Sequence, residues 1–205
     1  MNLVVENFTF EIPRLRRFVN IFFIKSCIFA AMEKFQNRYR IPSARASWWD
    51  YSADGCYFIT ICTVNHECLF GKIVNGTMHL SPIGKTVNEE WHKSFDIRKE
   101  LFCDAFIIMP NHIHAILRID NPDGGGGGAH AQSPPQRTPK SISSFVAGFK
   151  SAATVKINIL RNTPKMPVWQ PRFHDRIIRD ENEYRRIIHY IYENPLKWTD
   201  GEFHG

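Results

Sequence analysis

The longest extended stretch of this sequence runs from Phe102 to Ile119 and is interrupted once, at Pro110-Asn111. Proline has no amide hydrogen to offer a neighbouring strand, and asparagine often occupies turns. The stretch therefore predicts either two strands joined by a turn or one strand with a bend. In both cases a β-sheet is the element against which the rest of the chain must pack.

Shorter patterns before this stretch predict three more strands and a helix. The run YFITICTV, which begins at Tyr57, is rich in β-branched and aromatic residues and predicts a buried strand. Asn75-Gly76 lies between two short extended runs and predicts a β-hairpin, because both residues tolerate positive φ. After Ser81-Pro82, apolar residues spaced by four predict an amphipathic helix that ends near Asp96 (Ile83, Val87, Trp91 and Phe95).

Patterns after the stretch predict two more helices around one short strand. Apolar residues recur at helical spacing from Ile142 to Leu160, with Ser141 or Ser143 as the capping residue. The segment WQPRFHDRIIR predicts an extended piece, and a last helix is expected from about Glu181 through Tyr192. The resulting order, β, β-β, α, β-β, α, β, α, predicts one compact α+β domain with a mainly antiparallel sheet.

Two segments lie outside this pattern. In residues 1–31, three arginines precede an apolar stretch, as in a signal peptide, but the stretch is too short and too interrupted to cross a bilayer. Since Met32 opens a more globular sequence, a mis-assigned start and a targeting segment are both open, and no membrane association is expected. Residues 121–140 are rich in glycine and proline and lack the Walker phosphate-binding pattern, so they predict a flexible surface loop.

Charge and cysteine content narrow the class of protein. The net charge of +6 comes from 26 Lys and Arg against 20 Asp and Glu. Between Arg137 and Lys197 there are twelve basic and five acidic side chains, so the C-terminal third carries the excess. Such a surface suits a polyanion such as nucleic acid, although a solvated helix face has the same composition. The five cysteines are scattered without a Cys-x-x-Cys pair, which indicates a reduced, cytoplasmic setting.

Two histidines follow the Pro-Asn interruption, in the segment MPNHIHAIL. On a strand, side chains two residues apart share a face, so His112 and His114 are expected to project together while Ile113 and Ala115 point into the core. Two neighbouring neutral imidazoles suit a divalent metal with open coordination positions. On spacing alone, two unrelated histidines on a polar face are the alternative.

The last predicted helix carries the segment HYIYENP. Residues four apart stack on one helix face, so Tyr190 and Asn194 are expected to be neighbours, while Tyr192 points nearly opposite. A tyrosine beside a metal site becomes an effective nucleophile when a cation or basic neighbours favour the phenolate. For a lone tyrosine on an amphipathic helix, core packing is the alternative.

Taken together, these segments resemble the single-tyrosine HUH transposases, particularly the REP-associated tyrosine transposases and their insertion-sequence relatives. The resemblance rests on MPNHIHAIL followed by WQPRFHDRIIRDENEYRRIIHYIYENPLKW, and on the earlier segments NRYRIPSARASWWDY and YFITICT, and spans about residues 35–198. It implies a ferredoxin-like sandwich of HUH endonuclease type, with helices on one face of the sheet. Residues 32–205 would then form a single catalytic domain.

The resemblance also implies a role for each matched residue. Tyr190 is expected to be the catalytic nucleophile and His112 and His114 two metal ligands, with Asn194 either the third ligand or a helix cap. The implied metal is Mg²⁺ or Mn²⁺, and the implied partner is single-stranded or hairpin DNA. The expected reaction is nicking and rejoining of DNA through a 5′-phosphotyrosine, in transposition or REP-element processing, by a monomer or a homodimer.

Several residues are candidates for contacts with DNA. Five basic residues are expected to bind phosphates (Lys150, Arg172, Arg176, Arg179 and Arg185). Trp169 and Phe173 are candidates for stacking on bases, with core packing as the alternative.

Two other functions are open. A domesticated, non-catalytic nucleic-acid-binding protein would keep the fold without cutting DNA. A mononuclear metal hydrolase would need a further ligand, with three candidates (Asp104, Asp175 and His174).

Overall fold

The computed structural model describes residues 34–35, 38–39, 50–120 and 140–198, and the chain divides into two units, Met1–Pro42 and Ser43–Gly205. In the first unit, strands β1 (Lys34–Phe35) and β2 (Arg38–Tyr39) pair antiparallel. The predictions for residues 1–31 and for the glycine-rich loop up to residue 139 lie outside the described residues.

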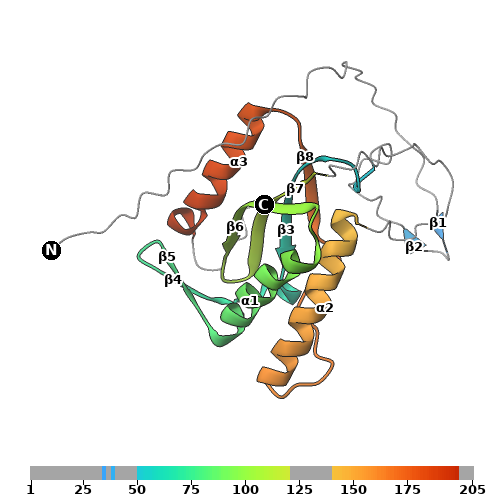
Figure 1. Cartoon of the computed structure of the whole chain (residues 1–205). Coiled ribbons are helices and arrows are strands. Elements are labelled where there is room, and N and C mark those ends of the chain that lie inside the picture. The colour runs from blue at the N-terminus through green and yellow to red at the C-terminus, as the bar shows by residue number, and fades with distance from the viewer. Residues whose placement is uncertain (1–33, 36–37, 40–49, 121–139, 199–205) are drawn as a thin grey trace. The chain divides into compact units, whose positions relative to one another are not determined.

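The second unit is built on a four-stranded sheet with the order β6-β7-β3-β8 (Figure 1). Every neighbouring pair is antiparallel, which confirms the predicted α+β class and sheet type. The four strands are β3 (Gly55–Cys62), β6 (Leu101–Ile108), β7 (His112–Ile119) and β8 (His174–Ile178). A separate hairpin follows the Asn75-Gly76 prediction, with β4 (Gly71–Val74) and β5 (Thr77–Leu80) on either side of the turn.

The interruption at Pro110-Asn111 separates β6 from β7, so two strands joined by a turn is the correct alternative. The Met109 amide donates to the His112 carbonyl at 2.8 Å, which closes the turn. The carbonyls of the two turn residues accept hydrogen bonds from other segments. The Pro110 carbonyl accepts from the Phe70 amide, and the Asn111 carbonyl accepts from the Thr63 amide. Both turn residues are therefore held in place by backbone hydrogen bonds to other parts of the fold.

Helices α1 (Pro82–Ile97) and α2 (Ile142–Leu160) cover one face of the sheet and form the main core with it. Alternate residues of β7 enter this core, including Ile113 and Ala115 as predicted, because side chains of a strand alternate between faces. The indole of Trp91 on α1 stacks on Phe106 with ring centroids 4.6 Å apart, and its edge meets Phe149 of α2. Burial of these large apolar side chains is the main stabilising contribution of the domain.

Helix α3 (Glu181–Glu193) packs on the opposite face of the sheet, apart from α1 and α2 (Figure 1). The prediction that helices cover one face therefore holds for α1 and α2 and not for α3. The physical reason is a second apolar patch on the other face, to which Ala105 of β6 and Ile116 of β7 contribute. Ile191 of α3 is fully buried against this patch.

A polar side chain caps each of the α-helices α1, α2 and α3 at its N-terminus. Ser81 accepts from the Gly84 amide at 3.0 Å, Ser141 from the Ser144 amide at 3.2 Å, and Asp180 from the Glu183 amide at 2.8 Å. Ser141 rather than Ser143 is thus the cap of α2. Among the described residues, no helix combines the length and apolar character that crossing a membrane requires.

Candidate active site

His112 and His114 lie side by side near the start of β7, on the face that α3 covers. Their ring centroids are 4.5 Å apart, and the residues are only 2 % and 1 % exposed. The prediction that the two imidazoles share a face is correct. This part of the sheet is buried, because α3 and the segment after it cover it. Whether the two histidines act together, rather than being unrelated residues of a polar face, stays a prediction.

Helix α3 brings Tyr190 to the histidine pair. The Tyr190 hydroxyl lies 3.3 Å from Nε2 of His114, and the two ring centroids are 5.2 Å apart. Phe58 of β3 supports both rings, with its centroid 5.2 Å from His114 and 6.2 Å from Tyr190. Tyr192 is 51 % exposed, consistent with its expected place on the far side of the helix.

Each histidine has a neighbouring side chain at Nδ1. The Asn111 amide oxygen lies 2.7 Å from Nδ1 of His112, and the Thr60 hydroxyl lies 2.9 Å from Nδ1 of His114. Thr60 is the direct cross-strand partner of His114, so the sheet register creates this contact. Sequence reasoning missed both neighbours: Thr60 reaches His114 only through the sheet register, which cannot be read from the segments separately, and Asn111 was interpreted only as a turn residue.

Burial keeps both imidazoles neutral at physiological pH. Burial lowers the pKa of His112 to about 4, with a smaller contribution from nearby His66. Burial likewise lowers the pKa of His114 well below its usual value, and neighbouring His112 adds to the effect. Neutral imidazoles carry a lone pair on one ring nitrogen, which is the form that binds metals.

The described residues contain no group of three His, Cys, Asp or Glu side chains that could hold a metal. Asn194 begins the 3-10 helix η2 (Asn194–Lys197), directly after α3, and is half-buried. Its backbone amide donates to the Ile191 carbonyl, so the helical path continues through this residue. The role of Asn194 as a metal ligand stays a prediction.

The three further ligands that a hydrolase could use are not gathered at the histidine pair. Asp175 pairs with Ile59, whose side chain enters the main core on the opposite face. Asp104 accepts from the Tyr184 hydroxyl at 3.2 Å and pairs with Arg118. His174 shares the face of His114 but lies one strand further on, across Thr60. This distribution weighs against a mononuclear hydrolase.

The predicted DNA-binding residues fall into two groups. Lys150 donates to the Gln170 and Arg172 carbonyls at 2.8 and 3.0 Å, and burial lowers its pKa to about 8. The guanidinium groups of Arg176 and Arg185 pair with Glu183 and Glu181 on α3. The Arg172 and Arg179 residues are exposed. Arg176 and Arg185 also keep most of their side-chain surface exposed, so the two groups differ in pairing with carboxylates rather than in exposure.

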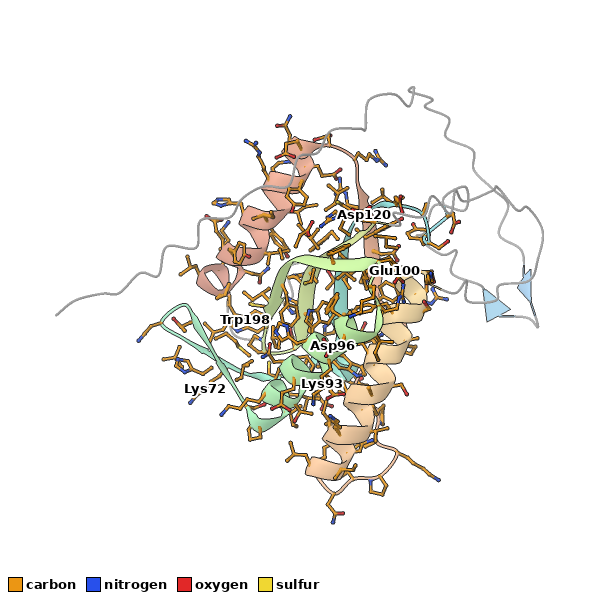
Figure 2. All side chains as sticks on the ribbon, in the orientation of Figure 1. Lys72, Lys93, Asp96, Glu100, Asp120 and Trp198 are labelled. Carbon is orange, nitrogen blue, oxygen red and sulfur yellow. The ribbon has the colours of Figure 1, made fainter. Side chains whose placement is uncertain are left out.

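The aromatic residues at the site differ from those expected. Trp169 is 7 % exposed and packs in the main core against Phe70 and Phe149, so the core alternative is correct. Phe173 also packs against that core. Trp198, which follows η2 and is labelled in Figure 2, lies instead beside His112, with ring centroids 6.0 Å apart. Its only sequence signal was its place shortly after Asn194-Pro195, beyond the helical pattern.

Known proteins resemble this chain in sequence and in fold. An uncharacterized protein of Haemophilus influenzae is 35% identical over 167 residues, which cover 79% of this chain and 92% of the relative. The REP-associated tyrosine transposase of Escherichia coli K12 is 27% identical over 94 residues, 46% of this chain and 44% of that protein. The solved structure of a REP-associated tyrosine transposase bound to a REP hairpin has a TM-score of 0.51 at 21% identity, covering 75% of this chain and 74% of that one.

The chain belongs to the same family as the Haemophilus influenzae protein, and it resembles the REP-associated tyrosine transposases in sequence and fold. The α+β fold, with its antiparallel sheet and three helices among the described residues, matches that of the solved transposase. No family model matches the sequence. The resemblance to a REP-associated tyrosine transposase supports a transposase-type function.

Proposed function

We propose that this chain is a metal-dependent DNA endonuclease and strand transferase that acts through a covalent bond to Tyr190. The observation that carries the proposal is the approach of the Tyr190 hydroxyl to within 3.3 Å of His114, one member of a buried histidine pair. A tyrosine that only packed in a core would have no need of a neutral imidazole at its hydroxyl. The arrangement suits a nucleophile beside a metal site.

The donor set fits a divalent cation bound mainly by oxygen. His112 and His114 would supply two nitrogen ligands, and Asn194, water or substrate oxygens would supply the rest, as Mg²⁺ and Mn²⁺ prefer. When bound, the metal would stabilise the negative charge that develops on a phosphate under attack. The side chains of this chain hold the remaining groups in place.

In the proposed step, the Tyr190 phenol oxygen forms a bond to the phosphorus, and the bond from phosphorus to the 3′ oxygen breaks. The phenol proton passes to water, and the leaving 3′ oxygen takes up a proton to become a 3′-OH. The product is a 5′-phosphotyrosyl ester, whose bond energy is retained for rejoining. The hydrogen bond to His114 and the ring contact with Phe58 orient Tyr190 for this step.

Single-stranded or hairpin DNA is the proposed substrate. The structurally similar transposase is bound to a REP hairpin, and the exposed Arg172 and Arg179 suit contacts to backbone phosphates. Trp198 lies beside His112 and would stack on an unpaired base next to the reacting phosphate. The proposed outcome is DNA transposition or the processing of REP elements.

The test is to incubate the protein with labelled hairpin DNA from the repeats that flank its gene, with Mn²⁺ or with chelator, followed by a denaturing protein gel. A covalent adduct should form only with Mn²⁺ and should be absent in Tyr190→Phe and His112→Ala. Tyr192→Phe is the matched control, because that tyrosine is half-exposed on another side of α3 and should leave the adduct unchanged.

Two other results would replace the proposal. Hairpin binding without an adduct in any metal would indicate a domesticated nucleic-acid-binding protein. Metal-dependent cleavage that survives Tyr190→Phe would indicate a hydrolase that activates water.

A further inference from the structure

We propose that Asn111 is a positioning residue that holds His112 in one tautomer, with the proton on Nδ1 and the lone pair on Nε2. The tautomer can be observed without metal, although its benefit for metal binding rests on the proposed function. Asn111 touches no reacting atom in this proposal and acts through His112 alone.

The orientation of the Asn111 amide is set by a second hydrogen bond. Its Nδ2 donates to the His66 carbonyl at 3.2 Å, so its Oδ1 is the atom that faces Nδ1 of His112 at 2.7 Å. An amide oxygen can only accept a hydrogen bond. The bond therefore requires a proton on Nδ1 of His112, and in a neutral imidazole the lone pair then lies on Nε2.

The backbone of Asn111 is held independently of its side chain. The Asn111 carbonyl accepts from both the amide and the hydroxyl of Thr63, at 2.9 and 3.0 Å. Thr63 is fully buried, and Asn111 is 2 % exposed. The amide of Asn111 is thus presented to His112 from a turn with little freedom to move.

A ring nitrogen that is bonded to a neighbouring group fixes both the tautomer and the direction of a metal-binding histidine. His114 has a hydroxyl at the equivalent nitrogen, from Thr60, and a hydroxyl can either donate or accept. Of the two contacts, the one from Asn111 fixes the tautomer of its histidine, because its oxygen can only accept, whereas the Thr60 hydroxyl leaves the tautomer of His114 open. This difference makes His112 the ring on which the inference can be tested.

The first experiment records long-range ¹H–¹⁵N spectra of the imidazoles in metal-free protein at about pH 8, where histidines are neutral. His112 should show a protonated Nδ1 in the wild type and in Asn111→Asp, which keeps the acceptor. In Asn111→Ala the ring should shift towards the other tautomer. A wild-type His112 protonated on Nε2 would overturn the inference whatever the protein's activity.

The second experiment measures Mn²⁺ affinity by electron paramagnetic resonance. Loss of such a neighbour to a metal-bound histidine typically weakens affinity by roughly 10–100-fold. Asn111→Ala should show such a loss, and Asn111→Asp should restore most of it. Asn158→Ala is the matched control, because Asn158 is a buried asparagine on α2 whose side chain also makes two kinds of hydrogen bond.

The outcomes separate this inference from the proposed function. Both asparagine-to-alanine variants should lower the melting temperature, but only Asn111→Ala should lower Mn²⁺ affinity. Equal affinities in Asn111→Ala and the wild type would overturn the inference and leave the proposed function standing. A wild type that binds no Mn²⁺ would overturn the proposed metal site together with the role of Asn111 in it.

Discussion

At the scale of single residues, the histidine pair carries an energetic cost. Both rings are almost fully buried, so the folded protein holds them neutral where the unfolded chain would accept protons. Uptake of protons by the unfolded state favours unfolding. The buried histidine pair therefore makes the stability of the protein sensitive to acid.

The first prediction is that the free energy of unfolding falls as the pH drops below about 6.5. The pKa of His112 is depressed from 6.5 to about 4 in the folded state. Through His112, the free energy of unfolding is highest above pH 6.5 and falls by about 3 kcal/mol as the pH drops to 4, because over this range only the unfolded state binds the proton. Urea unfolding with chelator present, from pH 8 to 5, should give a flatter profile for His112→Gln than for the wild type. Parallel profiles would contradict the depressed pKa.

A second prediction concerns Trp198 beside His112. If its indole stacks on a base, Trp198→Ala should weaken binding of labelled hairpin DNA by about 1–3 kcal/mol, measured by fluorescence anisotropy. The melting temperature should change little, because Trp198 is only partly buried and follows the last helix. Unchanged affinity would remove the indole from the DNA interface.

At the scale of elements, the start of helix α1 packs directly against the backbone at Phe70, a contact that its apolar pattern does not predict. Its first turn contains Gly84, where an added Cβ would lie 2.0 Å from the backbone oxygen of Phe70. The same oxygen accepts from the Ser81 amide just before the helix. Glycine is required here by the lack of space for a side chain, at a position whose conformation is helical.

A matched pair of glycine substitutions tests this contact. Gly84→Ala should lower the free energy of unfolding by about 1–3 kcal/mol, because backbone must shift to admit the methyl group. Gly148→Ala in α2 should raise it by about 0.5–1 kcal/mol, since an added Cβ there meets nothing within 4 Å and alanine favours the helix. Thermal and urea unfolding measure both. Equal effects would show that α1 can move away from Phe70.

Sequence patterns predicted the order of elements because turn residues and apolar periodicity are local. The Asn75-Gly76 hairpin was predicted for this reason, and the turn at Pro110-Asn111 was one of two predicted alternatives. The face on which α3 packs could not be predicted, because it depends on which residues of distant strands become neighbours. The same holds for Thr60, which reaches His114 only through the register of β3 with β7.

At the scale of the whole molecule, some of the basic side chains that give the C-terminal third its positive charge make contacts within the fold. Arg176 pairs with Glu183, which is 4 % exposed, and the Lys150 ammonium is bound by backbone carbonyls. Net charge in the sequence could not distinguish these internal contacts from a surface that is available to DNA. Arg172 and Arg176 are both exposed, but Arg176 is also paired with the buried Glu183 carboxylate.

The last prediction compares the two kinds of arginine. For single-stranded DNA, each lost phosphate contact should reduce the slope of log affinity against log salt by about 0.7. Arg172→Ala should show this reduction without a change in melting temperature. Arg176→Ala should instead lower the melting temperature, because it leaves buried Glu183 without its cation. The reverse pattern would assign Arg176 to the DNA and Arg172 to the fold.

The placement of α3 on the face opposite α1 and α2 separates the two halves of the proposed chemistry. The histidines belong to a central strand whose other side forms the main core, whereas the tyrosine belongs to a helix outside that core. Changes that loosen α3 can therefore silence cutting while the sheet and its two covering helices stay folded. A lineage of such proteins could give up catalysis and keep a folded DNA-binding scaffold.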